Sequence, residues 1–157
     1  MKLEHELLHY LISNYYLAIV PNFFIGTFEC DLFSLNKNLF TTEYEIKCSK
    51  PDFNNDFKKG TNYGKTNKHD LIKDGERTNK FYFVVDSKIE IDVPEYAGLI
   101  TFERSSYGVN FNRVKAAPFL HKQKANQDII NGCLVRLLWK FYHITRANTP
   151  SPLETIQ

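Results

Sequence analysis

The sequence contains three copies of a pattern in which an acidic side chain precedes a lysine by two residues. The copies are Glu45-Ile46-Lys47, Asp56-Phe57-Lys58 and Asp86-Ser87-Lys88. A carboxylate can hold a divalent cation, which activates a bound water and offsets charge on a phosphate oxygen, while a lysine can stabilise an oxyanion. The spacing is a weak signal by itself, so the elements that carry the three copies must distinguish between them.

Only a copy inside a β-strand directs both side chains to the same side, because residues i and i+2 share one face of a strand. Apolar and polar residues alternate over 42–48, which predicts a strand that contains Glu45 and Lys47. The second copy lies in 51–59, a predicted helix, where this spacing points the two groups apart. The third copy follows 81–85, a predicted buried strand. The first copy is therefore the best candidate for chemistry.

A preceding strand adds further acids to this face. Residues 28–33 also alternate, and the turn-forming Asn36-Lys37-Asn38 predicts an antiparallel hairpin with the Glu45 strand. Glu29 and Asp31 then lie on the same face as Glu45. Such close acids repel unless a cation lies among them, and oxygen ligands without Cys or His suit Mg²⁺ or Mn²⁺. The residues alone leave a solvated, acid-rich sheet face as an equal alternative.

Other segments indicate the elements that surround this hairpin. Glu4 lies in the apolar stripe of an amphipathic helix predicted from residue 2 to about 18, which ends before Pro21; its carboxylate either snorkels to solvent or faces a cation. The patterns further predict a short helix at 68–73, strands at 97–102 and 109–115, and a closing helix at 119–146. We expect one domain over residues 1–147 and a flexible tail over 148–157.

Composition limits the classes of protein. A chain of 157 residues, 43% hydrophobic and 24% charged, is typical of one globular domain and excludes disorder and coiled coil. Its 13 Phe and 9 Tyr favour a sheet-containing core. No stretch reaches the roughly 18 to 20 apolar residues of a membrane span, and the N-terminus lacks the apolar region of a signal peptide. The three cysteines form no CxxC pair. We expect a cytoplasmic protein with reduced thiols and no membrane partner.

Charge is distributed unevenly along the chain. Residues 1–49 contain six acids and three lysines, whereas residues 58–80 contain seven bases and three acids. Residues 110–148 contain seven bases and one acid. An acidic centre between basic flanks suits a protein that binds a polyanion, although solvated helix faces explain the same charges. The candidate nucleic-acid-binding residues are Lys50, Lys58, Lys59, Lys68 and His69, with a surface histidine of no further role as the alternative for His69.

Several segments together resemble one enzyme superfamily. They are residues 19–22, 29–32, 44–49, 52–59, 68–69, 81–85 and 94–100. In this combination the chain resembles the PD-(D/E)xK nuclease superfamily, and within it the MmcB-like DNA-repair family and its phage-type relatives, over about residues 19 to 103. The resemblance implies an α/β fold with a restriction-endonuclease-like core, in which α-helices flank a mixed central β-sheet.

The resemblance also implies roles for single residues. Asp31 and Glu45 match the metal-binding acids, with Mg²⁺ or Mn²⁺ as the cofactor, and Lys47 matches the catalytic lysine. Glu29 and Glu4 are candidate auxiliary metal ligands. Cys30 stands where the superfamily's proline is expected, and the pair Lys68-His69 matches a basic-His pair of the phage-type relatives.

The expected function is that of a metal-dependent deoxyribonuclease in DNA repair, recombination or the processing of phage and mobile-element DNA. Asp31 and Glu45 would hold the metal, and Lys47 would orient the attacking water. The alternative is a non-catalytic nucleic-acid-binding module that keeps a nuclease-like fold. The expected partner is DNA, and the oligomeric state is left open, with a homodimer as one option.

Overall fold

The computed structural model describes residues 3–12, 16–60 and 66–147. The chain divides into two compact units, Met1–Ala125 and Asn126–Gln157. The sheet belongs entirely to the first unit. The described part of the second unit is helix α4 (Gln127–Ala147), and the side chain of Asn126 caps it by accepting a hydrogen bond from the Ile129 amide.

A six-stranded mixed sheet forms the first unit, and its strands lie side by side in the order of the sequence. The central pairs β3–β4 and β4–β5 are parallel, and the outer pairs are antiparallel. The predicted α/β class, with a mixed sheet flanked by helices, is thus confirmed. The strands are β1 (Tyr16–Ile25), β2 (Phe28–Asn36), β3 (Thr41–Lys47), β4 (Lys80–Asp86), β5 (Gly98–Ser105) and β6 (Gly108–Lys115).

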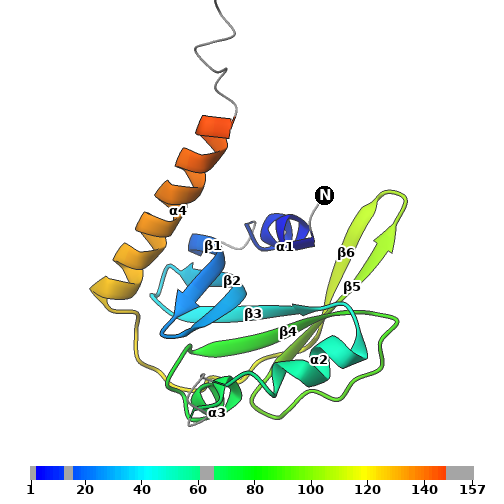
Figure 1. Cartoon of the computed structure of the whole chain (residues 1–157). Coiled ribbons are helices and arrows are strands. Elements are labelled where there is room, and N and C mark those ends of the chain that lie inside the picture. The colour runs from blue at the N-terminus through cyan, green and yellow to red at the C-terminus, as the bar shows by residue number, and fades with distance from the viewer. Residues whose placement is uncertain (1–2, 13–15, 61–65, 148–157) are drawn as a thin grey trace, which may run out of the picture. The chain divides into compact units, whose positions relative to one another are not determined.

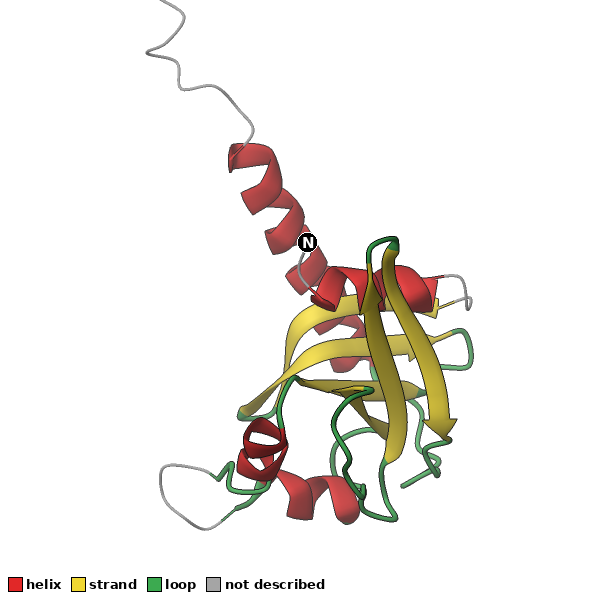
Figure 2. Cartoon of the chain, turned by 90° about the vertical axis from the view of Figure 1, so that its right-hand side faces the viewer, coloured by secondary structure: helices red, strands yellow, loops and turns green. Residues whose placement is uncertain are grey.

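Helices cover both faces of this sheet. Helix α1 (Leu3–Ile12) lies on one side, and α2 (Lys50–Asp56) and α3 (Lys68–Lys73) lie on the other, as two views at right angles show (Figures 1 and 2). The two faces carry separate apolar clusters because side chains alternate along each strand. We call them the α1 face and the α2/α3 face.

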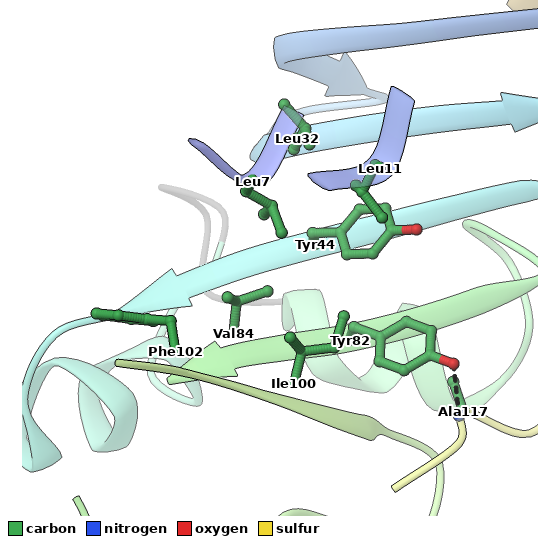
Figure 3. Packing of buried hydrophobic residues seen from close by; sticks show 9 residues of the cluster. All are labelled: Leu7, Leu11, Leu32, Tyr44, Tyr82, Val84, Ile100, Phe102 and Ala117. Atoms are coloured by element: carbon green, nitrogen blue, oxygen red, sulfur yellow. Dashed lines mark hydrogen bonds between the residues drawn. The ribbon is translucent and has the colours of Figure 1, made fainter. Parts of the chain in front are cut away.

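Each face has its own packing. On the α1 face, α1 leucines contact apolar side chains from β2 to β5 (Figure 3). On the α2/α3 face, Phe53 of α2 and Ile72 of α3 pack with Phe81 and Phe83 of β4. The α1-face residues drawn in Figure 3 are Leu7, Leu11, Leu32, Tyr44, Tyr82, Val84, Ile100, Phe102 and Ala117.

The predicted hairpin is confirmed as β2 and β3. Leu32 pairs with Tyr44 across the two antiparallel strands. In the connecting turn, the Asn36 side chain accepts hydrogen bonds from the amides of Asn38 and Phe40. Since Tyr44 belongs to the α1 face, alternation places its β3 neighbours on the α2/α3 face. This is how the strand directs its acids and lysine to one side.

The predicted N-terminal helix is wrong from residue 16 onward. Helix α1 ends at Ile12, and β1 begins at Tyr16, where a continued helix was expected. An apolar run of this kind fits either period, and pairing with β2 decides in favour of a strand. Pro21, which we took as a helix terminator, lies inside β1; a proline is tolerated there because β1 is an edge strand. The next residue, Asn22, adopts a φ of 51°.

The C-terminal helix is shorter than predicted. It begins at Gln127 instead of residue 119, after an irregular segment that contains Pro118. No helix in the described part of the chain is both long and apolar enough to cross a membrane. The predicted tail, 148–157, lies outside the described residues.

Candidate active site: a buried cluster of acids and lysines

Strand β3 supplies the centre of the candidate site. Glu43, Glu45 and Lys47 lie on its α2/α3 face, and each is at most 2% exposed. Burial of so many charges is costly unless each finds a partner of opposite charge. The adjoining helices α2 and α3 provide those partners, and the whole group is called the acid–lysine cluster below.

Glu45 accepts from three lysines. Its Oε2 lies 3.1 Å from Lys47 Nζ and 3.4 Å from Lys59 Nζ, and its Oε1 is bound by Lys68. Lys68 also lies 2.9 Å from Glu43 Oε1. Burial alone would lower the pKa of the Lys68 ammonium, but Glu43 and Glu45 raise it above its ordinary value. Lys68 therefore stays charged inside the protein.

Asp56 joins α2 to the same group. Phe53 and Asp56 are three residues apart, so both face the sheet, and Ser49 fixes the helix start by accepting the Asp52 amide. The Asp56 carboxylate receives Lys47 at 2.7 Å and Lys59 at 2.6 Å. His69 of α3 donates a hydrogen bond from Nε2 to Oδ2 of Asp56 at 2.7 Å, because an ionised carboxylate can only accept.

These partners set the charge states. Burial alone would raise the pKa of the Asp56 carboxyl, but the His69 hydrogen bond and the nearby lysines hold it well below its usual range. Burial would lower the pKa of Lys47, and the negative charges of Glu45 and Asp56 raise it instead. On the far side of the His69 ring, the hydroxyl of Tyr96 lies 3.0 Å from Nδ1. Burial raises the Tyr96 pKa to about 12, so this hydroxyl keeps its proton.

Arg77 connects the cluster to the β1–β2 turn. Its guanidinium binds both oxygens of Glu43, at 3.1 and 3.0 Å. It also donates to the carbonyl of Ile25 at 2.8 Å and to that of Phe28 at 3.4 Å. A bidentate pair of this kind is rigid, so the turn cannot shift without disturbing Glu43.

Asp31 differs from the other acids. Its Oδ2 accepts the Ile46 amide at 2.7 Å, and none of the described cations forms an ion pair with it. Burial, and then the negative charge of Glu45, raise the pKa of Asp31 to about 6, while Lys47 and Lys59 act in the opposite direction. The carboxylate is thus close enough to interact with Glu45 and Lys47.

Charge is balanced within the cluster. The carboxylates of Asp31, Glu43, Glu45 and Asp56 stand beside the cations of Lys47, Lys59, Lys68 and Arg77. In the described part of the chain, every buried side-chain polar atom has a hydrogen-bond partner. The arrangement is therefore stable as a set of ion pairs, and only the Asp31 carboxylate is left with a single backbone donor.

The acid–lysine cluster contains oxygen donors of the type that bind a divalent metal. Within the described residues, no group of three or more His, Cys, Asp and Glu side chains could hold a metal ion. Mg²⁺ needs fewer than three protein ligands, since it keeps several waters and is commonly bound by one or two carboxylates plus a substrate phosphate. Asp31 and Glu45 supply oxygen ligands of this kind, so the residues present fit the group.

The predicted residues fall into two sets. Asp31, Glu45 and Lys47 come together in the acid–lysine cluster, and Lys59 lies at its edge with 44% of its side chain exposed. Lys50 and Lys58 are exposed at the two ends of α2. The candidate auxiliary ligands lie elsewhere or face outward. Glu4 belongs to α1, which packs on the opposite face, and Glu29 is exposed, with its backbone carbonyl accepting from Lys68.

The alternative interpretation of His69 as a surface histidine is wrong, and the candidate DNA-binding residue Lys68 is buried as well. Lys68 is 0% and His69 is 5% exposed. Both side chains turn inward because they lie on the side of α3 that also carries Ile72, three and four residues further on. Lys68 is paired with Glu43 and Glu45, and His69 with Asp56.

Four residues of the site were not predicted from the sequence: Glu43, Asp56, Arg77 and Tyr96. A signal for Asp56 was present, because Phe53, Asp56 and Phe57 share the helical spacing of one buried face. Glu43 likewise precedes Glu45 at strand spacing. Arg77 and Tyr96 come from irregular segments, and no local pattern indicates that they reach the cluster.

Comparisons with known proteins define the fold only. The chain matches no family model and no curated protein. A solved protein of unknown function from Silicibacter pomeroyi has a similar structure, with a TM-score of 0.65 and 16% sequence identity. The match covers 90% of this chain and 88% of that one. The chain thus shares its architecture with a protein to which no activity is attached.

Proposed function

We propose that the protein is a metal-dependent nuclease that hydrolyses phosphodiester bonds of DNA. The observation that carries this proposal is the state of Asp31. Its carboxylate lies beside Glu45, its pKa is raised to about 6, and its one described partner is a backbone amide. A divalent cation between these two acids would relieve their repulsion.

The chain's own groups have distinct tasks in this proposal. A Mg²⁺ or Mn²⁺ ion held by Asp31 and Glu45 would supply Lewis-acid stabilisation and lower the pKa of a bound water. Lys47 lies 3.1 Å from Glu45 and 2.7 Å from Asp56, so its charge is fixed in place and no side-chain entropy is lost during the reaction. It would hold the attacking water and stabilise negative charge that develops on the phosphate.

Exposed lysines beside the cluster would bring DNA to it. Lys50 and Lys58 are exposed, and the side chain of Lys59 is 44% exposed next to Glu45 and Asp56. Phosphate contacts of this kind add affinity without sequence preference, and they weaken as salt is added. They place the backbone of DNA near Lys47 and Asp31.

The deciding experiment is a cleavage assay on linear, branched and single-stranded DNA with Mg²⁺ or Mn²⁺. Lys47→Ala should lose cleavage by about 10²-fold or more, because one preorganised donor typically contributes that much, while DNA binding scarcely changes. Asp31→Asn should lose activity and recover part of it with excess metal. Lys88→Ala is the matched control, because its acid–x–lysine copy lies at the exit of β4, outside the cluster.

A non-catalytic DNA-binding module is the second candidate, favoured by the internal charge balance of the cluster, which needs no further cation for stability. It predicts DNA affinity that falls steeply with salt but no cleavage. Replacing Lys50 and Lys58 by glutamine should flatten that salt dependence. This candidate replaces the nuclease if wild type and Lys47→Ala are equally inactive with every metal and DNA form, yet bind DNA. Absence of binding at low salt would remove both candidates.

A further inference from the structure

The α1 face of the sheet holds a cleft on the side opposite to the acid–lysine cluster. Its volume is about 200 Å³. Side chains from α1, from all six strands and from the segment after β6 line it, at the end of the sheet where β3 and β4 begin. The lining includes Tyr16, Tyr44, Tyr82, Lys80, Arg113 and Phe119.

The charged side chains that line the cleft are cations, among the described residues. Lys80 and Arg113 line it, and no aspartate or glutamate is among the described residues that do so. None of the ion pairs in the described part of the chain involves either cation. Lys80 is held in another way, with its Nζ 4.4 Å from the centroid of the Phe119 ring. Two cations without carboxylate partners attract an anion.

Neutral hydrogen-bond donors lie next to these cations. The hydroxyls of Tyr16 and Tyr44 are 3.4 Å apart, and Tyr44 is 3.5 Å from the Ser34 hydroxyl. Hydrogen bonds between hydroxyls are normally near 2.7 to 2.8 Å, so these contacts are long and leave capacity for a ligand oxygen. Burial raises the pKa of Tyr44 well above its ordinary value, so it remains a neutral donor.

The aromatic wall is fixed before any ligand arrives. The rings of Tyr44 and Tyr82 stack at 5.7 Å with 14° between their planes, and their hydroxyls point the same way in Figure 3. The Tyr82 hydroxyl accepts the Ala117 amide at 3.1 Å. Gly98 leaves the space for this ring, since a Cβ there would lie 2.4 Å from it. A rigid wall lowers the entropy cost of binding.

We propose that this cleft binds a small organic anion made of one planar ring and one phosphate or carboxylate group. The anionic group would meet Lys80 and Arg113, and the ring would pack against the tyrosine and phenylalanine rings. The size follows from the volume, because clefts for drug-sized ligands measure roughly 300 to 1,000 Å³ and this one is smaller. The site lies on the other face of the sheet and does not depend on the nuclease proposal.

Calorimetric titration of the full chain with phenyl phosphate and with benzoate tests this proposal. Phenyl phosphate should bind ten-fold or more tightly than its halves, inorganic phosphate and phenol, or benzoate should bind ten-fold or more tightly than its halves, acetate and phenol. The tighter probe identifies the anionic group. The double variant Lys80→Met/Arg113→Met should weaken that binding at least ten-fold. The matched control is Lys73→Met/Lys88→Met, which removes the same charge from exposed positions outside the cleft and should leave binding unchanged.

Three results would overturn the proposal. They are no binding of either probe beyond that of its halves, an unchanged affinity in the Lys80/Arg113 variant, and an equal loss in the control variant. If the double variant does not fold, Arg113→Met alone replaces it, since Arg113 is exposed on the edge strand β6. None of these measurements involves DNA or a metal, so the outcome is separate from that of the cleavage assay.

Discussion

The two faces of the sheet stabilise the same strands by different means. On the α1 face, leucines and tyrosines from α1, β3 and β4 bury apolar surface, which contributes wherever atoms are in contact. On the α2/α3 face, β3 turns Glu43, Glu45 and Lys47 inward, and stability there depends on each charge keeping its partner. Alternate residues of β3 thus point into an apolar interior on one face of the sheet and into a charged interior on the other.

This difference predicts how each face responds to change. Apolar packing loses stability in proportion to the atoms removed or crowded, whereas a buried ion-pair cluster loses several interactions when one partner is removed. A cluster of this kind is also weak evidence of a purely structural role, because well-packed apolar residues would be as stable. Substitutions on each face of the sheet test this difference.

The largest expected effect is from Lys68→Met. It leaves Glu43 and Glu45 buried without the ammonium that bridges them, and the free energy of unfolding should fall by about 3 to 5 kcal/mol. Urea denaturation measures this. Lys58→Met is the matched control, since Lys58 is exposed and its side chain bonds Asn55 alone among the described residues; its effect should stay within about 0.5 kcal/mol. Equal effects of the two substitutions would mean that the cluster does not contribute as described.

The next largest effect is expected on the α1 face, from Gly98→Ala. In Gly98→Ala the new Cβ would lie 2.4 Å from the Tyr82 ring and 2.7 Å from the Ala117 amide nitrogen. Overpacking of this kind should cost about 1 to 3 kcal/mol in the free energy of unfolding. Gly60→Ala is the control, because among the described residues a Cβ there meets one atom, at an ordinary 3.5 Å. A stable Gly98→Ala variant would show that Tyr82 is free to move, contrary to a fixed aromatic wall.

The smallest expected effect is a gain in stability, from Asp31→Asn. The pKa of Asp31 is about 6 in the folded chain against an ordinary 3.8, so the folded state binds the proton more tightly. Wild-type stability should therefore fall as pH rises from about 4 to 6 and stay lower above that range. Asp31→Asn keeps an acceptor for the Ile46 amide but removes the charge, so it should stabilise the protein by about 1 to 2 kcal/mol at pH 7.

The gain should vanish below about pH 4, where the wild-type carboxyl is also neutral. Thermal unfolding of both proteins across this pH range measures it. Added Mg²⁺ should reduce the difference at pH 7 if Asp31 holds a metal, because binding to the folded state stabilises only the wild type. A variant less stable than wild type at pH 7 would contradict the raised pKa.

Local patterns were sufficient for the hairpin. Alternation in β2 and β3 and the Asn36 turn predicted the strands, their pairing and the shared location of Asp31, Glu45 and Lys47. The buried strand β4 and the exposed edge strand β6 were also predicted, because their patterns are short and unambiguous. The paired residues of the β2–β3 hairpin are close in sequence, so a local pattern is sufficient there.

Long-range pairing determined what the patterns missed. Tyr16 to Val20 continue the apolar spacing of α1, and only the β2 strand beside them makes a strand of that segment. The basic residues between β3 and β4 were interpreted as a DNA-binding flank, with solvated helix faces as the alternative. Parallel pairing of these strands instead folds Lys68 and His69 back onto Glu45 and Asp56. A buried charge has no local signature when its partner is distant in the sequence.

The position of Pro21 in the edge strand β1 has a further consequence for the behaviour of the protein at high concentration. An open sheet presents unpaired backbone groups at its two edges, where another chain can add a strand. Pro21 has no amide to offer, and Asn22, with its φ of 51°, interrupts the regular extended backbone. At the other edge, β6 exposes Arg113. These features discourage edge-to-edge growth of the sheet, so we expect them to hinder fibril formation at high protein concentration.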